Sequence, residues 1–208
     1  MKPSSAGSTS ALRSCHRVAF KGRRWRCRTL RRLLTRIPTI DDVLDCHASA
    51  LGNDLVAYRN HVYRVANLCI GIGGGCGTLE KIATAAVFHD LGIWTDKTFD
   101  YIAPSIALAR EYLVARAQED WITEISTMIE NHHKITSSIA NPNSLVEPFR
   151  QADWIDVTGG LRRFGIPRRF VARLFATWPD AGFHWRLVQL ALHRFRTHPL
   201  TPLPMVRL

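Results

Sequence analysis

The sequence predicts an all-helical fold, and two patterns support that prediction. Apolar residues recur at intervals of three and four along most of the 208-residue chain, the spacing that places them on one face of a helix. No stretch shows the alternation of apolar and polar residues that is typical of a half-buried strand. With 46% hydrophobic and 22% charged residues, the chain has the composition of a globular protein, and its length suits one domain.

The first 36 residues differ from the rest in charge. They hold eleven of the 28 basic residues and no acidic one, so the other 17 basic residues balance all 17 acidic residues. We therefore predict a disordered basic arm over residues 1–37 and a helical domain over residues 38–208. The arm has the composition of an organellar transit peptide. It is equally suited to bind nucleic acid or an anionic surface through phosphate contacts. The third interpretation is a disordered extension of the domain.

The domain is predicted to begin with two helices. Pro38 ends the arm, and Asp41 and Asp42 favour a helix start because acidic side chains stabilise the positive end of the helix dipole. The next helix is predicted from residue 53 or 54 to Cys69, where apolar residues recur at helical spacing. Glycine-rich residues 71–77 lack the register of a phosphate-binding loop. We predict that they connect this helix to the next.

The remaining helices follow the same periodicity. They are predicted over residues 79–88, 105–118, 121–131, about fifteen residues that include Asp153, and two basic segments between residues 161 and 198. The polar and aromatic stretch 92–100 is predicted to be a loop, and the Asn-Pro-Asn-Ser segment 141–144 a turn. The core is therefore expected over residues 41–160, with the C-terminal helices over residues 161–198.

Cysteine usage and hydropathy bear on the compartment. The five cysteines are odd in number and form no C-x-x-C pair, so neither a disulfide framework nor a cysteine zinc site is predicted. The longest uncharged stretch, residues 65–79, contains five glycines and is shorter than the ~18 apolar residues of a membrane-spanning helix. We expect no membrane span and a reducing, cytoplasmic location, or an organellar one if residues 1–36 are a transit peptide.

Four residues with metal-binding side chains lie on three of the predicted helices. His61 lies mid-helix among apolar neighbours, His89 and Asp90 close the helix over residues 79–88, and Asp153 lies on a later amphipathic helix. Imidazole nitrogens together with carboxylate oxygens suit divalent first-row metals, and the carboxylates also admit harder ions. The order His, His-Asp, Asp resembles that of the HD-domain superfamily of metal-dependent phosphohydrolases.

The resemblance covers roughly residues 41–160 and implies a compact helical bundle in which the four residues just named bind one divalent ion, either Mn, Fe, Co, Ni, Zn or Mg. It also implies a phosphoric ester hydrolase that acts on a nucleotide or another small phosphorylated substrate through metal-activated water. Some members bind a second metal at the place of His132 and His133, with a further histidine upstream. That histidine is missing between residues 89 and 132, which favours one metal.

Seven further residues are candidates for roles around the ion. Several nucleotide-hydrolysing members carry an acidic residue where this chain has Ile93, so the general acid is expected elsewhere. The candidates are Asp96, His132 and His133 for proton transfer, Arg64, Trp94 and Lys134 for substrate binding, and Asp156 for support of the metal ligands. The histidine pair could also bind the substrate phosphate. Five of the seven have a structural interpretation as well: helix-end capping for the histidine pair, a surface ion pair for Arg64, core packing for Trp94, and a solvated carboxylate for Asp156.

Other classes of function fit the same residues. HD-fold proteins with paired irons oxidise substrates with oxygen, and a hydratase or lyase acting on a small molecule would use the same ligand types. A binding protein with a structural metal and a nucleic-acid-binding arm is the alternative outside enzymes. The substrate, the identity of the metal and the oligomeric state are not determined by the sequence.

Overall fold

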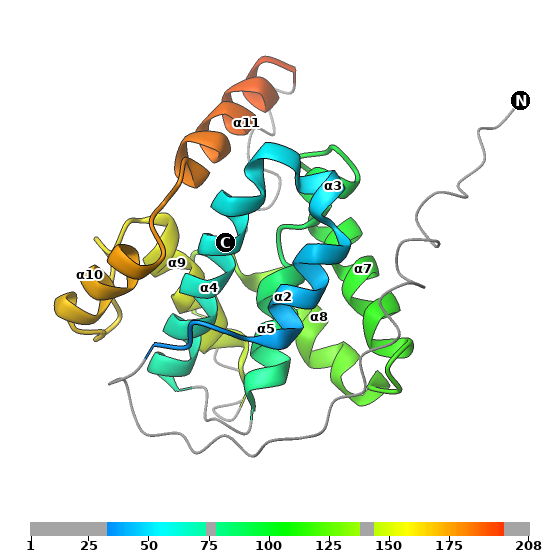
Figure 1. Ribbon diagram of the computed structural model, residues 1–208, viewed down its shortest axis with the longest axis horizontal. Coiled ribbons are helices and arrows are strands. Elements are labelled where there is room, and N and C mark those ends of the chain that lie inside the picture. Colours follow the sequence, from blue (N-terminus) through cyan, green and yellow to red (C-terminus); the bar gives the residue numbers. More distant parts are fainter. Residues whose placement is uncertain (1–32, 74–77, 138–143, 198–208) are drawn as a thin grey trace, which may run out of the picture.

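The computed structural model describes residues 33–73, 78–137 and 144–197, and every regular element in these ranges is helical (Figure 1). The predicted all-helical fold is therefore confirmed. Most of the predicted basic arm, residues 74–77 of the glycine-rich segment and most of the predicted turn 141–144 lie outside the described residues.

The described helices differ in length and position. The long ones are α2 (Pro38–Cys46), α4 (Leu55–Ile72), α5 (Leu79–Phe88), α7 (Ile102–Val114), α8 (Ile122–Asn131), α9 (Val146–Val157), α10 (Arg168–Thr177) and α11 (Phe183–Thr197). The short ones are the helices α3 (Ala48–Leu51) and α6 (Gly92–Thr95) and the 3-10 turns η2 (Gly52–Asp54) and η4 (Glu119–Trp121). Helix α5 has the predicted bounds, and α4 extends the predicted helix to Ile72.

Helix α4 runs through the centre of the bundle. Twelve of its eighteen residues are buried, because it packs against α9 and α5 and also contacts α2. A helix surrounded in this way would be expected to carry apolar residues on every side. It instead buries polar side chains, among them His61 and Arg64. Buried polar groups need partners, and these partners form the candidate site.

The stretch after α5 differs from the prediction. Residues 92–95 were predicted to belong to a loop but form α6, in which Ile93 and Trp94 are buried. The reason is a close approach: a Cβ atom on Gly92 would lie 2.7 Å from the carbonyl oxygen of Tyr101. Glycine lets this turn pack against the start of α7, where the Gly92 amide donates to Ser105 Oγ at 3.0 Å. Such contacts between distant residues are invisible to local periodicity.

Cys69 is a buried free thiol. None of the helices in the described ranges is both long enough and apolar enough to cross a membrane.

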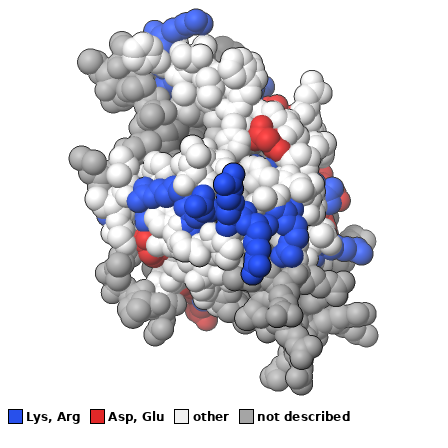
Figure 2. Space-filling model, turned by 90° about the vertical axis from the view of Figure 1, so that its left-hand side faces the viewer, with Lys and Arg blue, Asp and Glu red and all other residues white. Residues whose placement is uncertain are grey.

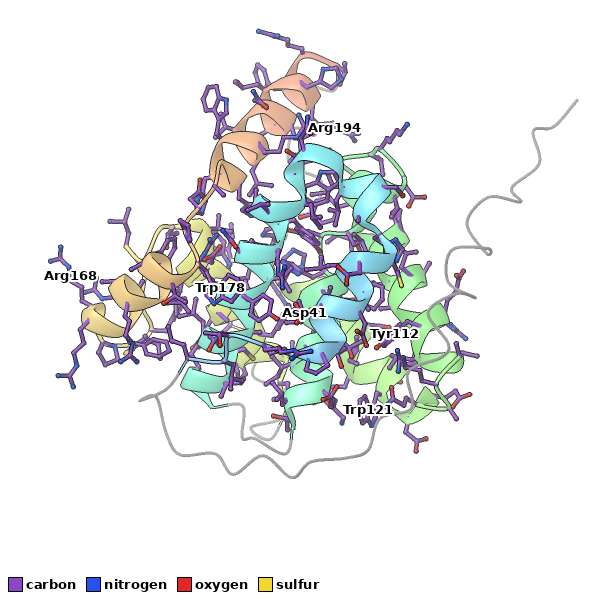
Figure 3. The ribbon with its side chains drawn as sticks, in the orientation of Figure 1. Asp41, Tyr112, Trp121, Arg168, Trp178 and Arg194 are labelled. Carbon is purple, nitrogen blue, oxygen red and sulfur yellow. The ribbon has the colours of Figure 1, made fainter. Side chains whose placement is uncertain are left out.

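The C-terminal helices lie on the outside of the bundle (Figure 1). Helix α10 packs through Phe170, Val171 and Leu174, whereas Phe183 is the one buried residue of α11. The segment between them returns to α4, where the Trp178 ring stacks on Tyr63 with ring centroids 4.1 Å apart. Figure 3 shows Trp178 beside the bundle and Arg168 directed away from it.

Candidate metal centre

Three helices bring the four predicted ligands together in the core. His61 lies in the middle of α4, His89 and Asp90 directly follow α5, and Asp153 lies in α9; all are at most 2% exposed. Because α4 packs against both α5 and α9, their inward faces meet at one place. His132, which directly follows α8, is also fully buried there.

The donor atoms of these residues have the mutual spacing of ligands around one ion. Nε2 of His61 lies 2.9 Å from Nε2 of His89. The distances from these nitrogens to Asp90 Oδ2 are 3.6 and 3.4 Å, and to Asp153 Oδ1 3.8 and 3.7 Å. Neighbouring ligands that bind a shared ion at about 2.1 Å lie about 3 to 4 Å apart. His61, His89 and Asp90 could therefore hold a metal ion together, and Asp153 Oδ1 lies beside both imidazoles.

The outer nitrogen of each imidazole already has a partner. The acceptors for Nδ1, at 2.6 or 2.7 Å, are Asp156 Oδ2 for His61, the Ala86 carbonyl for His89 and the Ile129 carbonyl for His132. Carbonyl and carboxylate oxygens can only accept a hydrogen bond, so each Nδ1 carries the hydrogen and the inner Nε2 of a neutral ring presents a lone pair. Metal-binding histidines are oriented in this way by such outer partners.

The inner atoms, by contrast, lack partners. Two neutral rings whose Nε2 lone pairs face each other at 2.9 Å repel unless a proton or a cation lies between them. The structure has seven buried side-chain polar atoms without a hydrogen bond in the described ranges, and four belong to this cluster: Asp90 Oδ1, His132 Nε2 and both carboxylate oxygens of Asp153. Buried polar atoms are normally paired. Cations bound by the cluster would satisfy these acceptors.

Both carboxylates are ionised at neutral pH. Burial acts to raise the pKa of Asp90, but the nearby imidazoles of His89, His132 and His61 hold it well below the usual value. The pKa of Asp153 is likewise lowered, because the neighbouring imidazoles, His89 first among them, outweigh the effect of burial. The site therefore offers two anionic ligands as well as imidazoles.

Asp156 supports His61 from behind. It is fully buried and accepts hydrogen bonds from His61 Nδ1 and from Arg64, whose Nη2 lies 2.9 Å from its Oδ2. Burial raises the pKa of Asp156, but these two hydrogen bonds and the Arg64 charge lower it to about 2. Asp156 is therefore a permanent anion that fixes the His61 ring, and it is not solvated.

Arg64 has partners only within the protein. Besides Asp156, its guanidinium donates to the carbonyl oxygens of Trp178 and Pro179 at 3.0 and 3.1 Å. The side chain is fully buried. This differs from both sequence interpretations, because the group is neither at the surface nor available to a substrate phosphate. It ties the segment between α10 and α11 to α4.

The protonation of His61 has a consequence for stability. Burial lowers its pKa, but hydrogen bonds and charges from Asp156 and Asp90 raise it from 6.5 to about 9. Because the folded value lies above the unfolded one, this interaction stabilises the metal-free fold fully below pH 6.5 and is lost as the pH rises through 9. Asp156, with its lowered pKa, contributes above its unfolded value of 3.8 and loses its effect as the pH falls through about 2.

We therefore expect the melting temperature of the metal-free chain in a chelator to fall between pH 6.5 and 9. A divalent cation should abolish that fall, because it replaces the proton on Nε2 of His61. Thermal unfolding from pH 5 to 9.5, with chelator and with added Mn²⁺, measures both effects. A metal-free melting temperature that rises across this window would contradict the assignment.

A second group of donor atoms adjoins the first. Asp90 Oδ1 lies 3.3 Å from His132 Nε2, and Asp153 Oδ2 lies 3.5 Å from His133 Nδ1. Each carboxylate thus has one oxygen near the His61–His89 pair and the other near the His132–His133 pair. Donor atoms of Asp90, His132 and His133 all lie within 4.8 Å of one another. The missing upstream histidine favoured a single ion, but both groups could hold one.

The two adjacent histidines differ in protonation. For His132, burial lowers the pKa, but the nearby carboxylates of Asp90 and Asp153 raise it above its usual value. For His133, burial and the positive charge of His132 lower the pKa to about 4. His132 is therefore the better proton donor of the two, and His133 is neutral at physiological pH.

Sequence reasoning missed three residues that complete the site. Tyr101, 1% exposed, has its hydroxyl oxygen 2.7 Å from Nε2 of His133. The Phe183 ring stacks on His61 with centroids 4.0 Å apart, and His184 Nε2 lies 2.9 Å from the carbonyl oxygen of Asp156. These contacts join residues far apart in the chain, and no local pattern marks them.

Two of the other predicted residues, Trp94 and Asp96, contact residues outside the cluster. Trp94 is 7% exposed, and its ring lies beside that of Tyr58 with centroids 4.7 Å apart. Its Nε1 donates a hydrogen bond to Asp54. Trp94 therefore occupies a core position. Asp96 is exposed at the end of α6 and accepts a hydrogen bond from the adjacent Thr95 hydroxyl. Lys134 is half-buried directly after the histidine pair.

Comparisons of the chain with protein-family models, curated protein sequences and solved structures find no match. A functional interpretation therefore depends on the residues of the cluster and their geometry.

Proposed function

We propose that this chain is a metal-dependent phosphohydrolase of the HD-domain type, with a divalent cation bound by His61, His89, Asp90 and Asp153. The observation that supports the proposal most directly is the convergence of the Nε2 atoms of His61 and His89 with Asp90 Oδ2 and the unpaired Asp153 Oδ1 in the buried core. The order of these residues along the chain, and their placement on α4, α5 and α9, agree with the resemblance.

Residues around the ion have separable tasks in this proposal. A divalent ion there would polarise a phosphoryl oxygen and lower the pKa of bound water towards neutrality. Asp156 holds His61 in the tautomer that a metal ligand needs. His132, whose pKa is raised, can hold a proton on Nε2 for the leaving group.

Exposure indicates where a substrate would approach. Of the clustered side chains, those of His61, His89 and His132 are fully buried and those of Asp90 and Asp153 are at most 3% exposed, whereas that of His133 is 16% exposed. Lys134 follows directly and is half-buried. A phosphate that enters beside His133 would meet an imidazole and then a cationic side chain. This supports a small phosphate ester as the substrate.

The direct test is turnover of phosphomonoesters and phosphodiesters by chelator-treated protein resupplied with Mn, Co, Ni, Fe, Zn or Mg. We expect no turnover without metal and restored turnover with at least one ion, together with one tightly bound ion per chain by elemental analysis. Metal-loaded protein that turns over nothing in the panel would contradict the phosphohydrolase proposal. Protein that binds no metal would contradict the site itself.

The second donor group supports one alternative function. Because both carboxylates lie between two pairs of histidines, the cluster also suits two ions, as in HD-fold oxygenases with paired irons. Elemental analysis separates the proposals: two irons per chain with oxygen consumption favour the oxygenase, and one ion with phosphate release favours the hydrolase.

Tyr101 provides a test of how the histidine pair is positioned. Tyr101→Phe removes the hydroxyl that contacts Nε2 of His133. We expect turnover to fall about tenfold to a hundredfold, as for other groups that orient a ligand. Ion binding at His61 and His89 should be unchanged, because neither contacts the hydroxyl. The matched control is Tyr112→Phe, a buried tyrosine in α7 that packs against Phe88 instead. Equal losses in the two variants would argue against a role for Tyr101.

A further inference from the structure

The folded chain is strongly polarised in charge. Residues 37–157 hold eight basic and sixteen acidic residues, a net charge of −8. Residues 158–197 hold eight arginines and a single acidic residue, Asp180, a net charge of +7. The balanced total over residues 37–208 therefore conceals two parts of opposite sign, and the positive part consists of α10, α11 and the turns around them.

One part of the positive charge forms a band on the surface. Five arginines of α10 and the preceding turn are exposed: Arg162, Arg163, Arg168, Arg169 and Arg173. Figure 2 shows a continuous band of basic side chains across the face that carries α10. Within the described ranges Arg168 and Arg169 form no ion pair, and Arg162 lies over the rings of Trp154 and Phe164. Carboxylates of the described residues therefore do not neutralise Arg168 and Arg169.

Helix α11 adds an exposed apolar stripe. Trp185, Val188, Leu192 and Phe195 are 63%, 45%, 52% and 56% exposed. Their spacing of three, four and three residues places them on one side of the helix. The opposite side faces the bundle, where Phe183 is buried and Leu187 and Leu190 pack partly against the core. Large apolar side chains that line up in this way on the surface mark an interaction site.

The polar residues of α11 have one sign of charge. The helix carries Arg186, Arg194 and Arg196 together with His184 and His193, and no acidic residue. Arg186 pairs with Asp54 at 3.0 Å, which holds the first half of α11 against the bundle. A helix with tryptophan, phenylalanine and leucine on one side and arginines beside them has the composition of helices that lie in the membrane interface.

We propose that α11 and the arginine band of α10 form a surface that binds an anionic phospholipid bilayer. The apolar stripe lies among the upper acyl chains, and the arginines contact lipid phosphates. A second copy of the chain fits less well, because two α11 helices would bring like charges together. Four side chains also offer less than the ~800 Å² per partner of a stable interface. Nucleic acid would use the arginines but leave the apolar stripe in water.

The experiment compares full-length variants in vesicle flotation, with phosphatidylcholine vesicles and with vesicles that also contain phosphatidylserine. Leu192→Ser/Phe195→Ser shortens the apolar stripe. Its matched control is Val56→Ser/Val114→Ser, which changes two other exposed apolar residues, 60% and 50% exposed, in α4 and α7. Residues 1–36 are present in every variant, so their own attraction to anionic vesicles cancels in the comparison.

We expect the partition coefficient of Leu192→Ser/Phe195→Ser on anionic vesicles to fall about tenfold or more, since two large apolar side chains no longer leave water. The control should bind as the unchanged chain does. Brominated acyl chains should quench part of the tryptophan fluorescence of the unchanged chain but less of that of Trp185→Phe. Equal partition of the two serine variants would overturn the proposal.

A second pair of variants tests the charge. Arg168→Glu/Arg169→Glu should bind anionic vesicles with an affinity about tenfold lower. The charge-matched control is Lys97→Glu/Arg110→Glu, at exposed positions just after α6 and on α7, and its affinity should not change. Binding of nucleic acid is measured on the same proteins. If Arg168→Glu/Arg169→Glu weakens nucleic-acid binding while vesicle binding stays unchanged, the surface is a nucleic-acid site and the membrane proposal is wrong.

Discussion

Asp90→Ala is expected to abolish tight metal binding and to lower phosphate-ester turnover by about 10³-fold or more, because metal activation supplies several kcal/mol and each ~1.4 kcal/mol is tenfold in rate. The two oxygens of Asp90 face both histidine pairs, at 3.4 Å from His89 and 3.3 Å from His132. Asp153 also lies between the two pairs, but its oxygens are farther from the histidines, at 3.7 Å from His89 and 3.5 Å from His133.

Asp96→Ala is the matched control for this prediction. It removes a carboxylate six residues away that is exposed and hydrogen-bonded to Thr95. Elemental analysis and initial rates should leave Asp96→Ala close to the unchanged chain. Full metal occupancy in Asp90→Ala would contradict the proposed centre, and a large loss of rate in Asp96→Ala would restore that residue as a candidate general acid.

Arg64→Met is expected to destabilise the fold by about 3–5 kcal/mol, the usual cost of removing one partner of a buried ion pair. The substitution leaves the Asp156 carboxylate buried beside His61 and removes the donor to two backbone carbonyl groups. Urea unfolding measures the change in the free energy of unfolding.

Arg59→Met provides the comparison on the same helix. Arg59 pairs with Asp41 at 2.7 Å, but its side chain is 45% exposed, and exposed pairs contribute less than about 1 kcal/mol. We also expect Arg64→Met/Asp156→Asn to recover part of the loss, since it removes the uncompensated charge. Equal destabilisation by Arg64→Met and Arg59→Met would show that the buried ion pair contributes no more to the free energy of unfolding than the exposed pair does.

Local sequence patterns predicted much of the fold. They succeeded where a helix is determined by residues that are close to one another in the sequence. Helix α5 has the predicted bounds because the glycines before it and the polar pair after it are close in sequence. Helix α6 was missed because its burial depends on the approach of Gly92 to Tyr101. Periodicity within a window cannot register such a contact.

The candidate site likewise has features that the sequence predicts and features that depend on the fold. The sequence placed His89 and Asp90 together at a helix end, but the spacing of their donor atoms relative to His61 is a property of packed helices. The partnership of Asp156 with Arg64 joins residues 92 positions apart, and that of Tyr101 with His133 joins residues 32 apart. Neither could be predicted without the fold.

The segment that follows α10 also sets an order of events during synthesis. Phe183 covers the ring of His61, and the carbonyl groups of Trp178 and Pro179 hold Arg64 in place behind it. A nascent chain that has emerged only through Asp153 possesses all four proposed ligands but neither the cover nor the anchor. The centre is therefore completed late, and a cation acquired earlier on the ribosome would be held by an open and weaker site.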